Sequence, residues 1–214
     1  MLDRLRVYSP PSFVMKLFPE FVWECSNEKI LFTFDDGPNP ETTPIILKTL
    51  SDKKIKAVFF LVGQNIERYK SLVSETISEG HEIANHTYSH YDVWGLNRKK
   101  INFEIKKCSQ LIEEVQGKPP RMFRPPHNRF NLWTAATSQK NNLKCVIWSL
   151  LTYDYKNDLN IVKFAGERYI AKNSVVVLHD SIKSKDIIVD SINFLADQIE
   201  HREFQIGKPS ECLN

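Results

Sequence analysis

The chain has 214 residues, of which 42% are hydrophobic and 26% are charged, and its formal net charge is +3. This length fits one domain with one core, and so apolar a composition excludes a disordered or fibrous chain. The small net charge gives no indication of a nucleic-acid partner, and no apolar run approaches the ~18–20 residues that a membrane span needs.

Residues 1–27 are predicted to form an arm that precedes the main body, residues 28–214. Three prolines break the arm, and we expect it to pack on the body through Phe18, Phe21 and Trp23. Charged side chains interrupt every stretch of the arm that could act as a signal segment. No signal peptide is therefore visible, and a cytoplasmic location is the default expectation.

Short runs rich in Val, Ile and Phe recur along the body and predict buried strands. In chain order they are Ile30–Phe34, Ala57–Val62, Glu82–Ala84, Arg121–Phe123, Cys145–Leu150, Val175–Leu178 and Glu203–Ile206. Amphipathic stretches between them predict helices. These are Pro40–Lys53, Ile66–Glu79, Arg98–Gln116, Leu132–Asn141, Leu159–Ala171 and Lys185–Glu200. The alternation indicates βαβ units and a mainly parallel sheet, which fits either a doubly wound sheet or an incomplete (β/α) barrel.

Polar residues with catalytic potential follow five of the predicted strands. In chain order they are Asp35 and Asp36, His86 and His90, Arg124 and His127, Asp154, and His179. In both architectures, ligands and catalytic groups gather at the carboxyl ends of parallel strands. We therefore expect these side chains to converge in space, which is stronger evidence than any single motif.

The adjacent carboxylates Asp35 and Asp36 come first, and Gly37-Pro38 after them supplies a turn. One interpretation is a helix N-cap or an Asx-turn before Pro40. The other is a metal ligand beside a general base, because a cation lowers the cost of placing two negative charges close together.

His86 and His90 are four residues apart, a spacing that on a helical turn puts both imidazoles on one side, within reach of one ion. The alternative is a pair of exposed or capping histidines. The nearby carboxylates favour the metal site. One Asp with two His leaves coordination positions open for water and substrate, which is typical of a catalytic site.

His179 and Arg124 each allow two interpretations. His179 follows four apolar residues and is either a core histidine hydrogen-bonded to backbone or a general acid beside a metal. Arg124 precedes two prolines and is either solvated or held where it orients a carboxylate.

Taken in order, these motifs resemble those of the polysaccharide deacetylase family, the carbohydrate esterases of family 4 that share the NodB homology domain. Two motifs match in full, Thr33–Gly37 and His86–His90, and Leu178-His179 matches the last one. Two depart in part. Arg124-Pro125-Pro126 is followed by His127 and Asn128 where the family has an aromatic residue and a glycine, and Asp154 is followed by Tyr155 where it has tryptophan.

The resemblance implies a distorted, incomplete (β/α) barrel with about seven parallel strands, and it implies a role for each matching residue. Asp36, His86 and His90 would hold a divalent ion, usually zinc and sometimes cobalt or another metal. Asp35 would be the general base, Arg124 the residue that orients it, His179 the general acid, and Asp154 the partner of that histidine. His127 would lend its backbone N–H to an oxyanion, and Tyr155 would keep an aromatic wall.

These roles predict metal-dependent removal of acetyl groups from N-acetylated sugars, with an acetylated carbohydrate as the partner. Chitooligosaccharide, peptidoglycan and similar glycans present the same acetamide. Three alternatives stay open: an O-acetyl esterase acting on a glycan, an amidohydrolase acting on a small amide, and a catalytically silent carbohydrate-binding barrel.

Overall fold

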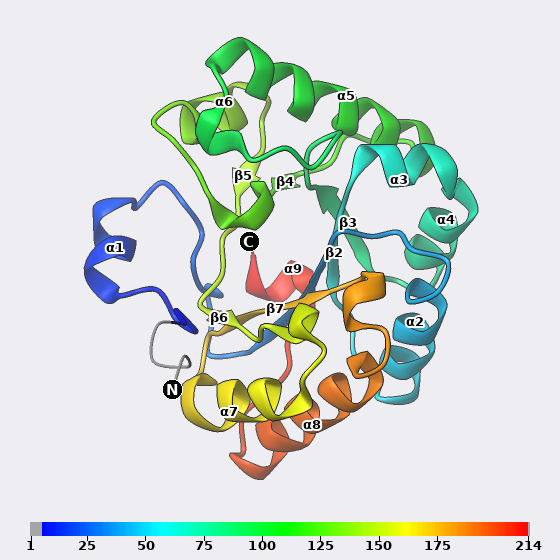
Figure 1. The fold of residues 1–214 in the computed structure, drawn as a ribbon, viewed down its shortest axis with the longest axis vertical. Coiled ribbons are helices and arrows are strands. Elements are labelled where there is room, and N and C mark those ends of the chain that lie inside the picture. Colours follow the sequence, from blue (N-terminus) through cyan, green and yellow to red (C-terminus); the bar gives the residue numbers. More distant parts are fainter. Residues whose placement is uncertain (1–5, 214) are drawn as a thin grey trace.

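The computed structural model describes residues 6–213, and seven parallel strands form its centre (Figure 1). The strands are β1 (Leu31–Asp35), β2 (Val58–Leu61), β3 (Glu82–Asn85), β4 (Met122–Phe123), β5 (Lys144–Cys145), β6 (Leu150–Leu151) and β7 (Val175–His179). Their order across the sheet is β5-β4-β3-β2-β1-β7-β6. The predicted α/β fold, an incomplete barrel of about seven parallel strands, is confirmed.

Helices surround the curled sheet (Figure 1). They are α1 (Ser12–Leu17), α2 (Thr43–Asp52), α3 (Gly63–Arg68), α4 (Lys70–Ser78), α5 (Arg98–Gln116), α6 (Thr134–Lys140), α7 (Leu159–Tyr169), α8 (Ile188–His201) and α9 (Pro209–Cys212). Short 3₁₀ turns in the described part of the chain follow strands or precede helices: η2 (Val93–Gly95), η3 (Pro126–Asn128), η4 (Asp154–Lys156) and η5 (Ile182–Ser184). The helix predicted over Ile66–Glu79 is wrong in one respect, because the chain leaves the helical conformation at Tyr69 (φ −132°, ψ 46°) and divides it into α3 and α4.

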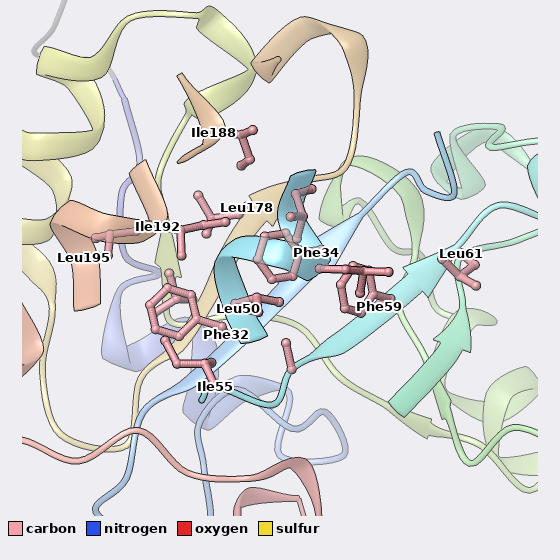
Figure 2. Close-up of a cluster of buried hydrophobic side chains, with 14 of the residues drawn as sticks. Phe32, Phe34, Leu50, Ile55, Phe59, Leu61, Leu178, Ile188, Ile192 and Leu195 are labelled. Carbon is pink, nitrogen blue, oxygen red and sulfur yellow. The ribbon is translucent and has the colours of Figure 1, made fainter. Parts of the chain in front are cut away.

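The central strand β1 is buried along its whole length, which explains its continuous apolar run. Successive side chains of a strand point to opposite faces. Phe32 and Phe34 accordingly pack in the cluster beneath α2 and α8, together with Leu50 and Ile192 (Figure 2), whereas Leu31 joins a second cluster. Packing on both faces fixes the position of β1, and with it the position of the residues that follow.

Two of the predicted strands are wrong, because neither run forms a single strand of the sheet. The run Cys145–Leu150 is not one strand, because β5 and β6 lie at opposite edges of the sheet and the chain crosses the open side of the barrel between them. The run Glu203–Ile206 is not a strand of the sheet, since Ile206 makes an isolated parallel bridge with Ile30. The predicted number of strands therefore agrees with the structure, although not all of the predicted strands are the observed ones.

The segment before β1 packs over this open side of the barrel. Val22 forms a parallel bridge with Val146, in the segment that crosses from β5 to β6. Phe21 and Trp23 are buried, and the Phe21 ring lies 4.5 Å from the ring of Phe130. The division into an arm and a catalytic domain remains a prediction. Within residues 6–213, no helix combines the length and the apolarity needed to cross a membrane.

Candidate active site

The residues singled out in the sequence meet at the carboxyl edge of the sheet. A cavity of about 190 Å³ is lined by Asp35, Asp36, His86, His90, His127, Asn128, Leu151, Tyr155, His179 and Lys183. Arg124 and Asp154 do not line it but are wholly buried beside Asp35 and His179 respectively. A larger groove of about 880 Å³ lies at the amino edge of the sheet, next to Lys29 and Lys56, and contains none of the predicted site residues.

The turn after β1 brings both carboxylates into the cavity. Asp35 is the last residue of β1, and Asp36 adopts a left-handed conformation (φ 78°) that reverses the usual alternation of side chains. Gly37 follows where a Cβ atom would lie 2.2 Å from the Asp180 carboxylate, so this position requires glycine. The Asp35-Asp36 pair is therefore neither an N-cap nor an Asx-turn but two convergent acids.

Asp180 itself has a structural position. It does not cap the turn after it, whose N-cap is Ser181, but accepts hydrogen bonds from the hydroxyls of Thr42 and Thr43, at 2.5 and 2.6 Å. Burial raises the pKa of Asp180 to about 7, although the two hydroxyls oppose this shift. The residue thus joins the end of β7 to the start of α2.

Asp36, His86 and His90 form a cluster with the donor set of a metal site. The Nε2 atoms of His90 and His86 lie 3.0 and 3.6 Å from Oδ1 of Asp36, and the three donor atoms are all within 4.8 Å of one another. The segment is not the helical turn that the spacing predicts. Left-handed conformations at Thr87 (φ 67°) and His90 (φ 57°) fold it back instead, and the His90 N–H donates to the Thr87 hydroxyl.

His86 and Asp36 are in the protonation states that a cation needs. His86 donates its Nδ1–H to the carbonyl oxygen of Arg124 at 2.8 Å, which leaves the lone pair of Nε2 facing Asp36. Burial lowers the pKa of His86 to about 4, so the ring is neutral at pH 7. Burial would raise the pKa of Asp36, but the hydrogen bond to His90 and the nearby histidines hold it below its usual range. Two imidazole lone pairs and a carboxylate fit a divalent ion.

Arg124 holds Asp35 from behind the cavity and is not solvated. Its Nη1 donates to Oδ1 of Asp35 at 2.7 Å, and its other N–H groups donate to the carbonyl oxygens of Val146 and Ile147. Its guanidinium carbon lies 4.0 Å from the centroid of the Phe60 ring. Because Arg124 occupies Oδ1, Oδ2 is the oxygen of Asp35 that faces His86, at 3.9 Å.

His179 is paired with a buried carboxylate and is not a core histidine bonded to backbone. Its Nδ1 and its backbone N–H both donate to Asp154, each at 2.7 Å. Burial would lower the pKa of His179, but the charge of Asp154 and the hydrogen bond to it raise it to about 9. The ring is therefore protonated at neutral pH, and Nε2 is the nitrogen left for a ligand.

The three residues that depart from the family pattern, His127, Asn128 and Tyr155, all line the cavity. His127 (φ 56°) and Asn128 (φ 51°) are both left-handed, and asparagine tolerates that conformation better than most residues, which explains its presence where glycine is usual. The His127 ring lies 4.8 Å from that of His90, although the sequence predicts a role for its backbone alone. The Tyr155 ring lies edge-on to that of His179, at 4.9 Å.

Comparison with known proteins bears directly on this arrangement. The sequence profile described as polysaccharide deacetylase matches residues 24–146, which are more than half of the chain. The chain belongs to the polysaccharide deacetylase family.

Two curated relatives and one solved structure show how far the similarity extends. A peptidoglycan-N-acetylglucosamine deacetylase of Bacillus cereus is 36% identical over 151 residues, which cover 70% of this chain and 54% of that protein, about half its length. A second B. cereus protein of the same name is 30% identical, over 89% of this chain and 92% of that one. The crystal structure of a peptidoglycan N-acetylglucosamine deacetylase matches with a TM-score of 0.86 at 26% identity, over 96% of this chain and 97% of that one.

Two residues that line the cavity, Leu151 and Lys183, lie outside the set that the sequence predicts. Lys183 is an exposed lysine on η5, four residues after His179. No motif marks it, since a lysine in a short turn is ordinary. The feature of the sequence that could have indicated Lys183 is its position shortly after the carboxyl end of a strand that carries a catalytic candidate.

Proposed function

We propose that this chain removes acetyl groups from N-acetylated sugars of a glycan by metal-assisted hydrolysis. One observation carries the proposal: a single cavity holds a metal-type donor cluster, a carboxylate without a proton donor on one oxygen, and a protonated histidine. Hydrolysis of an acetamide needs these three elements, since water is a weak nucleophile and an amine is a poor leaving group. The family, and the deacetylases that the chain resembles, support the same reaction.

Asp36, His86 and His90 would hold the ion, for which we propose zinc, although the donor set also suits cobalt and other divalent metals. A bound ion of this kind lowers the pKa of water and polarises a carbonyl oxygen. Asp35 takes the proton of the attacking water on Oδ2, because Arg124 holds Oδ1 and fixes the plane of the carboxylate. Positioned base catalysis of this kind contributes about 10²–10⁴-fold.

His179 donates its proton to the departing sugar amine. Asp154 keeps the ring charged and oriented, so that Nε2 carries the proton at neutral pH. The base and the acid are thus separate groups whose surroundings suit them to opposite tasks. The backbone N–H of His127 stabilises the oxyanion, a contribution of ~3–4 kcal/mol where such a donor has been removed. Tyr155 supplies the wall against which the sugar lies.

The test is acetate release from a panel of acetylated glycans by metal-stripped and metal-restored protein. We expect release from N-acetylglucosamine oligomers or peptidoglycan only after a divalent ion is restored. Asp35→Asn should abolish release while the ion still binds, and full activity in that variant would defeat the assignment. Release from acetylxylan alone would indicate an O-acetyl esterase, and release from a small amide alone an amidohydrolase. Tight glycan binding without any acetate would indicate a silent barrel.

A further inference from the structure

Two lysines near His179 have no carboxylate partner among the described residues, 6–213. Lys183 lines the cavity, and the ammonium of Lys156 lies 5.6 Å from the centroid of the Tyr155 ring, which also lines it. Both lysines are exposed, and neither forms an ion pair within residues 6–213. Lys185, two residues beyond Lys183, contrasts with them because it pairs with Glu41 at 2.6 Å.

The turns that carry these lysines are fixed relative to the catalytic candidates. Lys156 ends η4, which begins at Asp154, the partner of His179. Lys183 lies in η5, where the hydroxyl of Ser184 donates to the carbonyl oxygen of His179 at 2.6 Å. The two turns pack against each other. The lysines are therefore held on one side of the cavity, next to the residue that would meet the sugar amine.

Three carboxylates near these two turns bond to other groups, and Asp36, which also lines the cavity, lies 3.0 Å from Nε2 of His90. Asp154 accepts from His179, Asp186 accepts from Asn157 at 2.8 Å, and Glu41 pairs with Lys185. This side of the cavity is therefore suited to bind a negative charge.

We propose that Lys156 and Lys183 recognise an anionic group on the substrate, a carboxylate or a phosphate carried by the reacting sugar or by its neighbour in the glycan. The inference rests on the proposed function and adds to it the charge of the preferred substrate. Lys183 lines the cavity and Lys156 lies beside the Tyr155 ring that lines it, and neither belongs to the metal-type cluster, so both lysines act on substrate binding. Their removal should raise KM and leave kcat largely unchanged.

The test compares three N-acetylated tetrasaccharides: neutral chitotetraose, an alternating oligomer of N-acetylglucosamine and N-acetylmuramic acid, and chitotetraose carrying a 6-phosphate. The readout is the ratio of kcat/KM on each charged oligomer to kcat/KM on the neutral one. This ratio cancels any general effect of a substitution on folding. The muramic and phosphate arms distinguish a carboxylate from a phosphate as the recognised group.

We expect the wild-type ratio to exceed one for at least one charged oligomer and to fall in 0.5 M salt, which screens exposed charges. Lys183→Gln and Lys156→Gln should each lower the ratio about 3- to 5-fold, in line with an exposed charge pair, and the double variant should lower it about 10-fold or more. Lys185→Gln is the matched control and should keep the wild-type ratio. A ratio that none of the lysine variants changes, or that Lys185→Gln lowers equally, would overturn the proposal.

A binding measurement separates this inference from the proposed function. In the Asp35→Asn background, calorimetry should give a lower Kd for the charged oligomer than for chitotetraose, and Lys183→Gln should remove that preference. Suppose the wild-type protein releases acetate from no oligomer, but the binding preference for the charged oligomer is present and is lost in Lys183→Gln. In that case the deacetylase assignment fails and the anion site stands. If acetate is released without any charge preference, the anion site fails and the deacetylase assignment stands.

Discussion

Two histidines line the same cavity, and their surroundings shift their pKa values in opposite directions. His86 donates its Nδ1–H to a carbonyl oxygen, and burial lowers its pKa to about 4. His179 donates its Nδ1–H to the carboxylate of Asp154, which outweighs burial and raises its pKa to about 9. The charge of the acceptor on the far side of each ring is the main difference. A neutral acceptor leaves a lone pair for a metal, and an anionic one keeps a proton ready for a leaving group.

The largest effect on activity is expected when His86 is removed from the metal-type cluster. His86→Ala deletes one of three donors, so the affinity for a divalent ion should fall by more than the ~10–100-fold typical of losing an outer partner, and acetate release should be lost with it. Competition with a chromogenic chelator measures the affinity. His201→Ala is the control, because that histidine is exposed at the end of α8. Undiminished metal affinity in His86→Ala would place the ion elsewhere.

The acid side is weakened by Asp154→Asn, which keeps a hydrogen-bond acceptor for His179 but removes the charge. Without that charge burial is opposed only by the smaller effects of Asp36 and Asp35, and the pKa of His179 should fall well below 9. The basic limb of the pH profile of kcat/KM should therefore move to lower pH, with a loss of about 10-fold or more at pH 8. Asp158→Asn, at the exposed N-cap of α7, should leave the profile in place. An unmoved basic limb in Asp154→Asn would show that His179 is not the acid.

The opposite pKa shifts of His86 and His179 predict that the free energy of unfolding of the metal-free protein falls toward both acid and alkaline pH. The pKa of His179 is raised in the folded state. Its contribution to the free energy of unfolding, roughly 3 kcal/mol, is therefore complete below pH 6.5 and is lost as pH rises through about 9. For His86 the folded pKa is lowered, so its contribution is complete above pH 6.5 and is lost as pH falls through about 4. Urea unfolding from pH 4 to 10 in chelator measures both limbs.

The alkaline limb can be assigned by substitution. Asp154→Asn should flatten the loss of unfolding free energy between pH 7 and 9.5, because the pairing that raises the pKa of His179 is gone. The acid limb should persist in that variant, since His86 bonds to the Arg124 carbonyl and not to Asp154. An alkaline limb that stays equally steep would mean that another group causes it.

The sequence predicts the convergence of the site better than it predicts the local conformation. Strand-end polar residues meet in one cavity because parallel strands end at one edge, and this follows from alternation alone. The turn at His86–His90 was not predictable as a helical segment, since the left-handed residues that fold it depend on packing around β3. The split of Cys145–Leu150 into β5 and β6 is likewise set by the closure of the barrel, because an apolar run has no signal for the sheet edge that it joins.

Lys183 and the His127 ring show a different limit. A motif identifies a residue by its neighbours in the chain, but the walls of a cavity are chosen by the fold. His127 stands where the family has an aromatic residue. The contact of its ring with the ring of His90 depends on two consecutive left-handed residues. We therefore expect substrate preference to depend on the turns after the strands, which carry no motif in the sequence, whereas the candidate catalytic residues follow the strand ends.

The smallest expected effect comes from the residue that supports Asp154. The hydroxyl of Thr152 lies 3.1 Å from Oδ1 of Asp154 and 2.7 Å from the carbonyl oxygen of Val177, so its single proton serves one or the other. Thr152→Val removes that donor while nearly conserving volume, and a lost hydrogen bond of this kind corresponds to about 3- to 10-fold in kcat. Thr152→Ser keeps the hydroxyl and should restore the rate. Equal losses in both variants would show that Thr152 acts through packing, in which case the charge of Asp154 alone accounts for the contrast between His179 and His86.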